Sequence, residues 1–286
     1  GIDWPVPTRE VPGVDATADA ALLMYTSGTT ARPKGCLVRH STWLAAARAL
    51  VERYALRAGE RFWNPLPMFH MAALHPFAAC ATAGATFVSM TRFDATLAPA
   101  QVERERIDVL YAAFPTILAD FVNAPGFDAA RHPRIRRINC VAPPDTLRRL
   151  QAALPHAALT SVYGLTEAGG VVAYGLAEEP LDVRVSTCGR PFDGVDVRIA
   201  DPSHRPLAAG EGGEVQLRGW CVFDGYWRQP EATAAAFTPD GWLRTGDLGS
   251  LDDAGRIRFH GRAKDVLKVG GENVSAVGVE SVLALH

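Results

Sequence analysis

Short apolar segments alternate with amphipathic segments over roughly the first two thirds of this 286-residue chain. Between the apolar segments, apolar positions recur at helical spacing, for example from residue 42, with Ser41 as the expected N-cap, and from Pro144, which suits a first helical turn. Strands that alternate with helices predict an α/β fold, with a mostly parallel sheet covered by helices on both faces. The apolar runs of strand length are residues 20–25, 85–90, 109–113, 138–142 and 158–162.

The pattern changes after about residue 182, where glycines separate β-like segments such as VDVRIA, GGEVQLRG and GRIRFHGR. Residues 251–259 predict a β-hairpin, because Asp252 to Gly255 form a turn-type sequence between two strand patterns. A helical pattern ends the chain at residues 278–286. We therefore expect an α/β part over residues 1–182, a β-rich subdomain over 183–262, and a hinge with the start of a small C-terminal lid domain over 263–286.

Composition narrows the class of protein. Apolar residues make up 48% of the chain, charged residues 21%, and the formal net charge is −2, as in ordinary globular proteins. This balance gives no support for a nucleic-acid-binding surface. No apolar run reaches the roughly 20 residues that span a bilayer, and no signal-peptide pattern opens the chain, so we expect a cytoplasmic protein. The five scattered cysteines predict free buried thiols rather than a metal site.

Hydroxyl-bearing and small residues follow the first apolar run. The segment TSGTTARPK, from Thr26 to Lys34, stands between a strand pattern and a helical pattern. Small residues let backbone N–H groups approach an anion, hydroxyl groups donate further hydrogen bonds, and Lys34 adds positive charge. The Walker pattern is not matched, because Gly35 follows Lys34. The segment predicts a phosphate-binding loop, with an ordinary polar turn as the alternative.

Three further side chains are candidates for related chemistry. Glu167, in SVYGLTEAGG, follows a predicted parallel strand, where a carboxylate can hold Mg²⁺ beside phosphates; a solvated loop glutamate is the alternative. Asp247 lies between two glycines, where it can accept from both hydroxyls of a ribose or serve only as a turn residue. His70, in an apolar and aromatic segment, is either structural or part of a site.

Six segments occur in a fixed order along the chain: YTSGTTARPKG, PLPMFH, VAPP, YGLTE, TGDLG and GRAKDVLKVGGENV. Together they resemble the adenylate-forming (AMP-binding) superfamily, which includes acyl-CoA synthetases, peptide-synthetase adenylation domains and luciferases. The resemblance extends from about residue 20 to residue 280. It implies that ATP activates a carboxylic acid to an acyl-adenylate, with release of pyrophosphate, and that the acyl group then passes to a thiol. Because of its VGGENV segment, the chain most resembles an acyl-CoA ligase. This resemblance implies ATP and Mg²⁺ as cofactors and coenzyme A as co-substrate.

The resemblance also implies roles for individual residues. Glu167 would coordinate Mg²⁺, Thr166 would contact the α-phosphate, and His70 would stand between the acid pocket and the thiol tunnel; with Lys34 these are the expected catalytic residues. Further nucleotide-binding residues would be Thr26, Ser27, Gly28, Thr29, Thr30, Ala142, Pro143, Pro144, Tyr163, Gly164, Asp247 and Arg262. Lys264 would be the hinge, and Lys268, Gly270, Gly271 and Glu272 would approach coenzyme A. Candidates for the acid pocket are His70, Met71, Phe114, Gly169 and Gly170.

Two departures from the family pattern bear on activity. Ala31 stands where many relatives have glycine, and the chain ends before the C-terminal lysine that the family uses for adenylation. We therefore expect a fragment of a longer enzyme, without the N-terminal part of the large domain, that adenylates weakly by itself. The alternatives to an acyl-CoA ligase of fatty acid metabolism are an adenylating enzyme that loads a carrier protein or forms an amide, and a catalytically silent adenylate-binding module. The expected partners are small molecules, and homo-oligomerisation stays open.

Overall fold

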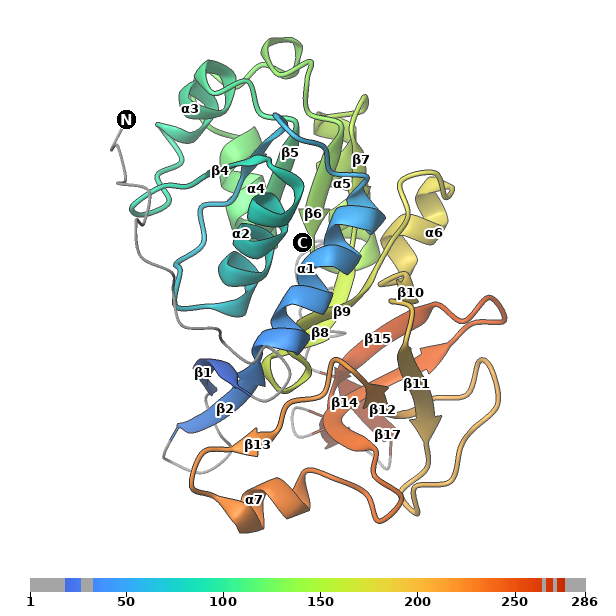
Figure 1. Cartoon of the computed structure of the whole chain (residues 1–286). Coiled ribbons are helices and arrows are strands. Elements are labelled where there is room, and N and C mark those ends of the chain that lie inside the picture. The colour runs from blue at the N-terminus through green and yellow to red at the C-terminus, as the bar shows by residue number, and fades with distance from the viewer. Residues whose placement is uncertain (1–18, 27–32, 264–265, 270–271, 276–286) are drawn as a thin grey trace, which may run out of the picture.

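The central element of the fold is a five-stranded parallel sheet (Figure 1). The computed structural model describes residues 19–26, 33–263, 266–269 and 272–275. In spatial order the strands are β4 (Thr86–Val88), β3 (Arg61–Trp63), β5 (Val109–Ala113), β6 (Arg137–Cys140) and β7 (Ala158–Thr160). The predicted α/β fold with a parallel sheet is confirmed, although β3 was not among the predicted strands.

Helices bury both faces of this sheet, because successive side chains of a strand point to opposite faces. In β5, Val109 and Tyr111 pack in one apolar cluster with α1 (His40–Tyr54) and α2 (Met71–Ala83). Leu110 and Ala112 pack in a second cluster on the other face. The helices of that face are α3 (Ala98–Arg104), α4 (Pro115–Val122), α5 (Pro144–Ala153) and α6 (Leu181–Ser186). A strand buried on both faces is a continuous apolar run, which is why VLYAA is readable from the sequence.

The strand β1 (Ala20–Thr26) does not join the parallel sheet, so this part of the sequence-based prediction was wrong. It pairs antiparallel with β2 (Lys34–Arg39), and β13 (Gly225–Tyr226) completes a separate three-stranded sheet. Strand β2 was missed because its apolar run is short and continues directly into a helical pattern. The hydroxyl-rich segment therefore connects two strands of a hairpin, rather than a strand and a helix.

The expected start of α1 also needs correction. Ser41 is not the N-cap, since the helix begins at His40 and Arg39 takes the cap position without a side-chain hydrogen bond. The chain enters α1 directly from β2, so the pairing of β2, and not a capping side chain, determines where the helix begins. Pro144, by contrast, lies at the first position of α5 as expected.

After β7 the chain enters an antiparallel sheet of β8 (Val162–Leu165), β9 (Gly170–Tyr174) and β10 (Arg190–Pro191). The predicted strand over residues 158–162 is thus divided between two sheets. Glu167, in the short 3₁₀ helix η2 (Thr166–Ala168), follows an antiparallel strand and not a parallel one, contrary to the prediction. Pairing of β8 with β9 pulls the chain away from the parallel sheet before Glu167 is reached.

The β-rich segment forms a four-stranded antiparallel sheet of β11 (Val195–Ala200), β12 (Gly213–Gly219), β14 (Leu243–Leu251) and β15 (Ile257–Arg262). The predicted hairpin joins β14 and β15, and its turn is closed by Asp252, whose Oδ1 accepts from the backbone nitrogens of Ala254 and Arg256. The remaining helical elements are η1 (Ala129–Arg131) and α7 (Pro230–Ala235).

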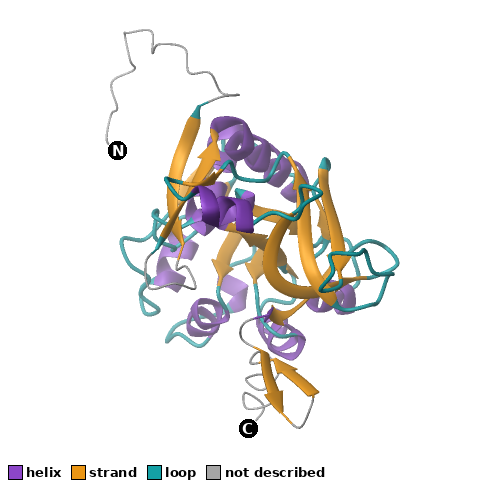
Figure 2. Ribbon diagram, turned by 90° about the horizontal axis from the view of Figure 1, so that it is seen from below, coloured by secondary structure: helices purple, strands orange, loops and turns teal. Residues whose placement is uncertain are grey.

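The last described elements, β16 (Val266–Val269) and β17 (Glu272–Ser275), form an antiparallel pair that Figure 2 shows at one end of the molecule. The helical pattern at 278–286 lies outside the described residues. The division into three parts stays a prediction. All five cysteines are free and buried, as expected. Within the described ranges, no helix combines the length and apolar character that crossing a bilayer requires.

Gly189 lies where the β8–β9–β10 sheet meets the four-stranded sheet. The backbone nitrogen of Cys188 donates to the oxygen of Ile257 at 2.7 Å, and Ile257 donates back to the oxygen of Gly189 at 3.0 Å. A Cβ atom at Gly189 would stand 1.9 Å from the backbone oxygen of Tyr174, and its φ of 78° is left-handed. Tyr174 ends β9, so only glycine allows the segment that leads into β10 to approach β9 this closely.

We therefore expect Gly189→Ala to cost about 3 kcal/mol or more of unfolding free energy, the range of severe steric disruption. Gly241→Ala is the matched control, because Gly241 has a similar φ of 83° but nothing within 4 Å of its added Cβ. The control should lose only about 1 kcal/mol of unfolding free energy, because alanine is strained in the left-handed backbone conformation. Urea unfolding of both variants measures the difference, and equal losses would show that the close approach is unimportant.

Candidate active site

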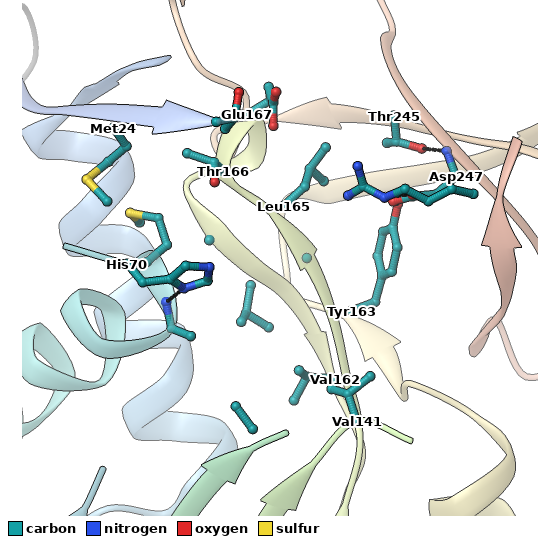
Figure 3. A pocket seen from close by; sticks show the side chains of 18 of the residues that line it. Met24, His70, Val141, Val162, Tyr163, Leu165, Thr166, Glu167, Thr245 and Asp247 are labelled. Carbon is teal, nitrogen blue, oxygen red and sulfur yellow. Dashed lines mark hydrogen bonds and ion pairs between the residues drawn. The ribbon is translucent and has the colours of Figure 1, made fainter. Parts of the chain in front are cut away.

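A cavity of about 760 Å³ opens where the carboxyl ends of β5 and β6 meet three of the other sheets. Ala113 ends β5 and Val141 follows β6, and both line the cavity. Binding sites of α/β folds lie at this edge of a parallel sheet. Figure 3 shows side chains from distant parts of the sequence around the cavity, including His70, Thr166, Glu167 and Asp247.

One corner of the cavity holds a cation, a phenol and a carboxylate. Thr26 and Lys34 are paired neighbours where the β1–β2 hairpin opens into its loop, and both line the cavity. The Nζ atom of Lys34 lies 4.7 Å from the ring centroid of Tyr226, a cation–π distance. The hydroxyl of Tyr226 donates to Oε1 of Glu167 at 2.9 Å. The ends of the hydroxyl-rich loop are therefore fixed at the cavity wall, beside Glu167.

The carboxylate of Glu167 makes this corner electronegative. Burial, and next the charge of Glu167, raise the pKa of the Tyr226 hydroxyl and bring the pKa of the Cys36 thiol to about 12. Both groups therefore stay protonated, and Cys36 is not a nucleophile. Within the described part of the chain, no group of three or more His, Cys, Asp or Glu side chains could hold a metal ion. A single carboxylate fits Mg²⁺ only where substrate phosphates supply further ligands.

Asp247, on β14, is a buried carboxylate with 2% of its surface exposed. Oδ2 accepts from the hydroxyl of Tyr163 at 2.9 Å, while Nε of Arg262 lies 3.2 Å from Oδ1. This second contact has an ion-pair distance without hydrogen-bond geometry, so Oδ1 has no hydrogen-bond partner among the described residues. Burial is the main reason that the pKa of Asp247 is raised. A buried acceptor in a cavity wall fits a ligand hydroxyl group.

His70 has a structural role and also lines the cavity. It is the N-cap of α2, where its Nδ1 accepts from the backbone nitrogen of Ala72 at 3.0 Å. A neutral ring must then carry its proton on Nε2, and partial burial lowers the pKa of His70, which favours the neutral form. Figure 3 shows the ring directed into the cavity. The structural and functional interpretations of His70 are therefore compatible.

The other end of the cavity is apolar and aromatic. Its wall includes the predicted pocket residues Met71, Phe114 and Gly170. Gly169 does not line the cavity: its Cβ would meet Thr42 at 2.6 Å, so this glycine serves packing and leaves no room for a substrate. Further apolar contacts at this end come from Phe69, Ala72, Tyr111, Ala113 and Val171.

The predicted nucleotide-binding residues are not all in the cavity wall. Tyr163, Gly164, Thr166, Asp247 and Arg262 line it. Gly164 is also required by packing, since its Cβ would stand 2.1 Å from the oxygen of Gly170. Of the VAPP segment only Val141 lines the cavity, whereas Ala142, Pro143 and Pro144 do not. Pro143 instead caps α5, so this segment sets the helix start beside the cavity.

Several predicted residues cannot be placed. Ser27, Gly28, Thr29, Thr30, Ala31, Lys264, Gly270 and Gly271 lie outside the described residues. Lys268 and Glu272 belong to β16 and β17, for which only the backbone is described. Their predicted roles therefore stay predictions.

Sequence reasoning missed several residues of the wall. Tyr226 bridges Lys34 and Glu167, yet nothing in its local sequence marks it, since its role depends on β13 pairing with β2. Thr245 accepts from the backbone nitrogen of Asp247 at 3.0 Å and orients that residue. Phe259 lies 6.2 Å from Tyr163, between ring centroids. The TGDLG segment could have indicated Thr245, because a hydroxyl two residues before an aspartate commonly bonds its backbone.

Comparisons with known proteins show which proteins this chain is similar to. The chain is 36% identical over 273 residues to a 3-[(3aS,4S,7aS)-7a-methyl-1,5-dioxo-octahydro-1H-inden-4-yl]propanoyl:CoA ligase of Mycobacterium tuberculosis, which covers 94% of this chain and 52% of that protein. It is 33% identical over 284 residues to 4-coumarate–CoA ligase 5 of Oryza sativa subsp. japonica, covering 96% and 52%. The chain thus spans about half the length of these curated relatives.

Solved structures give the same result. The crystal structure of ATP-bound MatB from Rhodopseudomonas palustris matches with a TM-score of 0.83 and 30% identity, over 92% of this chain and 52% of that one. The sequence profile described as AMP-binding enzyme matches residues 3–227, well over half of the chain. The chain therefore belongs to the AMP-binding enzyme family.

Proposed function

We propose that the protein carrying this chain activates a carboxylic acid with ATP to an acyl-adenylate and then transfers the acyl group to coenzyme A. The observation that supports this most is that one cavity joins a cation-bearing corner, a buried carboxylate and an apolar end. The relatives named above are CoA ligases, and one similar structure holds ATP. Phosphates, ribose and acid then have chemically matched surroundings in one space.

The adenylation step uses side chains that bind and orient. Lys34 and the hydroxyl-rich loop hold the β- and γ-phosphates, Thr166 contacts the α-phosphate, and Asp247 accepts hydrogen bonds from the ribose hydroxyls. Glu167 would hold Mg²⁺, which supplies positive charge for the phosphate oxygens. A carboxylate oxygen of the acid forms a bond to the α-phosphorus, and the bond from that phosphorus to the pyrophosphate oxygen breaks. Cationic groups and N–H donors stabilise the charge that develops on the phosphate oxygens.

The second step transfers the acyl group to the thiol of coenzyme A. Sulfur forms a bond to the acyl carbon as the thiol gives its proton to solvent. The bond from that carbon to the phosphate oxygen breaks, and AMP leaves with the bonding electron pair. His70, which lines the cavity, controls access for the thiol in this proposal. Lys264 as a hinge, and Lys268, Gly270, Gly271 and Glu272 near the thiol, complete this proposal. In this proposal the protein is cytoplasmic, and its partners are small molecules.

Release of AMP by the complete protein that carries this chain tests the proposal. We expect AMP and pyrophosphate from a panel of carboxylic acids, with sustained AMP release only when coenzyme A is present. Equal turnover without thiol would favour an enzyme that forms amides or loads a carrier protein. Tight ATP binding without pyrophosphate exchange for any acid would favour a silent adenylate-binding module.

Glu167→Gln should lower kcat/KM for AMP formation at least about 100-fold, because the transition state loses its metal-holding charge. Its neighbour Tyr226 can still donate to the amide oxygen, so the fold should be retained. Glu231→Gln, an exposed change in α7, is the control and should leave kcat/KM unaltered. Steady-state kinetics at several Mg²⁺ concentrations measure both. Unchanged magnesium dependence in Glu167→Gln would contradict this role.

Asp247→Asn should weaken ATP binding about tenfold or more, because an amide accepts less strongly than a carboxylate and leaves a charged partner unmatched. Stability should not fall at neutral pH. Since burial raises the pKa of Asp247, the folded state binds its proton more tightly than the unfolded state, and this group's contribution declines as pH rises through the raised pKa.

Calorimetric ATP titration and unfolding curves between pH 4 and pH 8 measure both effects. Asp253→Asn, on the exposed hairpin turn, is the control for each. Any stability advantage of Asp247→Asn should shrink as the pH is lowered, because the native carboxyl then becomes neutral as well. A variant that loses stability while it keeps its ATP affinity would reverse the assignment and make Asp247 a structural residue.

A further inference from the structure

His75 is a fully buried histidine that the proposed function does not use. It lies on the inner face of α2, one turn after the cavity residue Met71, and has 0% of its surface exposed. Nε2 lies 2.8 Å from the backbone oxygen of Ala46 in α1. Nδ1 is buried and has no hydrogen-bond partner in the part of the chain that the structure describes. An unpaired buried polar atom is costly, so it calls for an explanation.

The contact with Ala46 fixes the tautomer of His75. A carbonyl oxygen can only accept, so Nε2 must carry the proton and Nδ1 must present a lone pair when the ring is neutral. Burial lowers the pKa of His75 to about 4, so the ring is neutral near pH 7. The unpaired atom is therefore an acceptor that needs a donor.

This acceptor lies just behind the apolar end of the cavity. A Cβ atom placed on Gly170 would stand 3.6 Å from Nδ1 of His75 and 3.3 Å from Cε of Met71. Gly170 and Met71 both line the cavity. Because Gly170 has no side chain, the position of its absent Cβ lies against both Nδ1 of His75 and the flexible thioether of Met71, and an unbranched methionine repacks readily.

We propose that Nδ1 of His75 accepts a hydrogen bond from a hydroxyl or N–H group at the end of the acid substrate remote from its carboxylate. The inference rests on the proposed function and names the substrate class: carboxylic acids with a distal hydrogen-bond donor. A buried acceptor in apolar surroundings discriminates strongly, since an acid without the donor leaves it unpaired. His75 is then a specificity-determining residue.

Two pairs of acids test the preference in the complete protein. The first pair is ω-hydroxyhexanoate and hexanoate, and the second is phenylpropanoate with and without a para-hydroxyl group. The ratio of kcat/KM within a pair cancels losses of folded enzyme, which affect both acids equally. We expect the hydroxylated acid of at least one pair to be favoured about tenfold or more. Ratios close to one in both pairs, with AMP formed normally, would overturn the inference and leave the proposed function intact.

Two substitutions separate recognition from packing. The nitrogen of glutamine can replace Nε2 and keep the bond to Ala46, but it leaves no acceptor at the Nδ1 position. The oxygen of asparagine replaces the Nδ1 acceptor and gives up the bond to Ala46. We expect His75→Gln to abolish the preference for hydroxylated acids and His75→Asn to retain it. The opposite order, or an unchanged ratio in His75→Gln, would mean that His75 only packs the core.

A spectroscopic measurement decides the case in which no acid gives AMP, where the proposed function itself fails. In protein labelled with ¹⁵N-histidine, the Nδ1 signal of His75 should have the shift of an unprotonated ring nitrogen. Adding ω-hydroxyhexanoate or the para-hydroxylated phenylpropanoate should move it, whereas their unsubstituted counterparts should not. A signal that neither hydroxylated acid moves would overturn the inference independently of turnover.

Discussion

The close approach of Gly189 to strand β9 is the constraint on which the site depends. Gly189 lies against the backbone of Tyr174 at a distance that admits no side chain, and backbone hydrogen bonds from Cys188 and Ile257 tie the same segment to β15. Strand β14 pairs with β15, so the same contact brings Asp247 against Tyr163 on β8. The buried carboxylate and the phenol that holds it therefore owe their distance to a glycine outside the cavity wall.

The cavity combines groups whose hydrogen-bonding capacity is left partly unused. One carboxylate oxygen of Asp247 and one ring nitrogen of His75 are both buried acceptors without hydrogen-bond partners among the described residues. The first lies at the polar part of the cavity and the second behind its apolar end. Folding leaves each with a desolvation cost that a correctly placed ligand donor can offset. Stability and recognition are opposed at both positions, as is common in binding sites.

The sequence was most informative where one local property determined the structure. The continuous apolar run of β5, Pro144 at the start of α5 and the turn at Asp252 were all readable, because burial on two faces, a fixed φ and a side-chain-closed turn each leave a local signature. The order of the six motifs likewise indicated the family. Strand β2 and the separation of β8 from β7 were not readable, since both depend on which distant strand supplies the hydrogen bonds.

The site was predictable in its chemistry and less so in its surroundings. The sequence marked Glu167 as a carboxylate after a strand and Asp247 as a carboxylate between glycines, and both line the cavity. The strand expected before Glu167 was parallel, which was wrong. Tyr226 escaped notice because a single tyrosine carries no sign of the strand that places it over Lys34. His75 escaped because only coordinates reveal that one of its nitrogens is paired and the other is not.

The wall of this cavity is assembled from residues as far apart as Met24 and Ala263, on four different sheets and the helix α2. No contiguous segment therefore forms this cavity, which exists only when all four sheets are assembled. A bound nucleotide would contact several sheets at once, so its binding energy would add to the free energy of unfolding of all of them together. A substitution in any one sheet can consequently lower ligand affinity without touching the cavity wall. Ligand affinity therefore measures how completely the chain has folded.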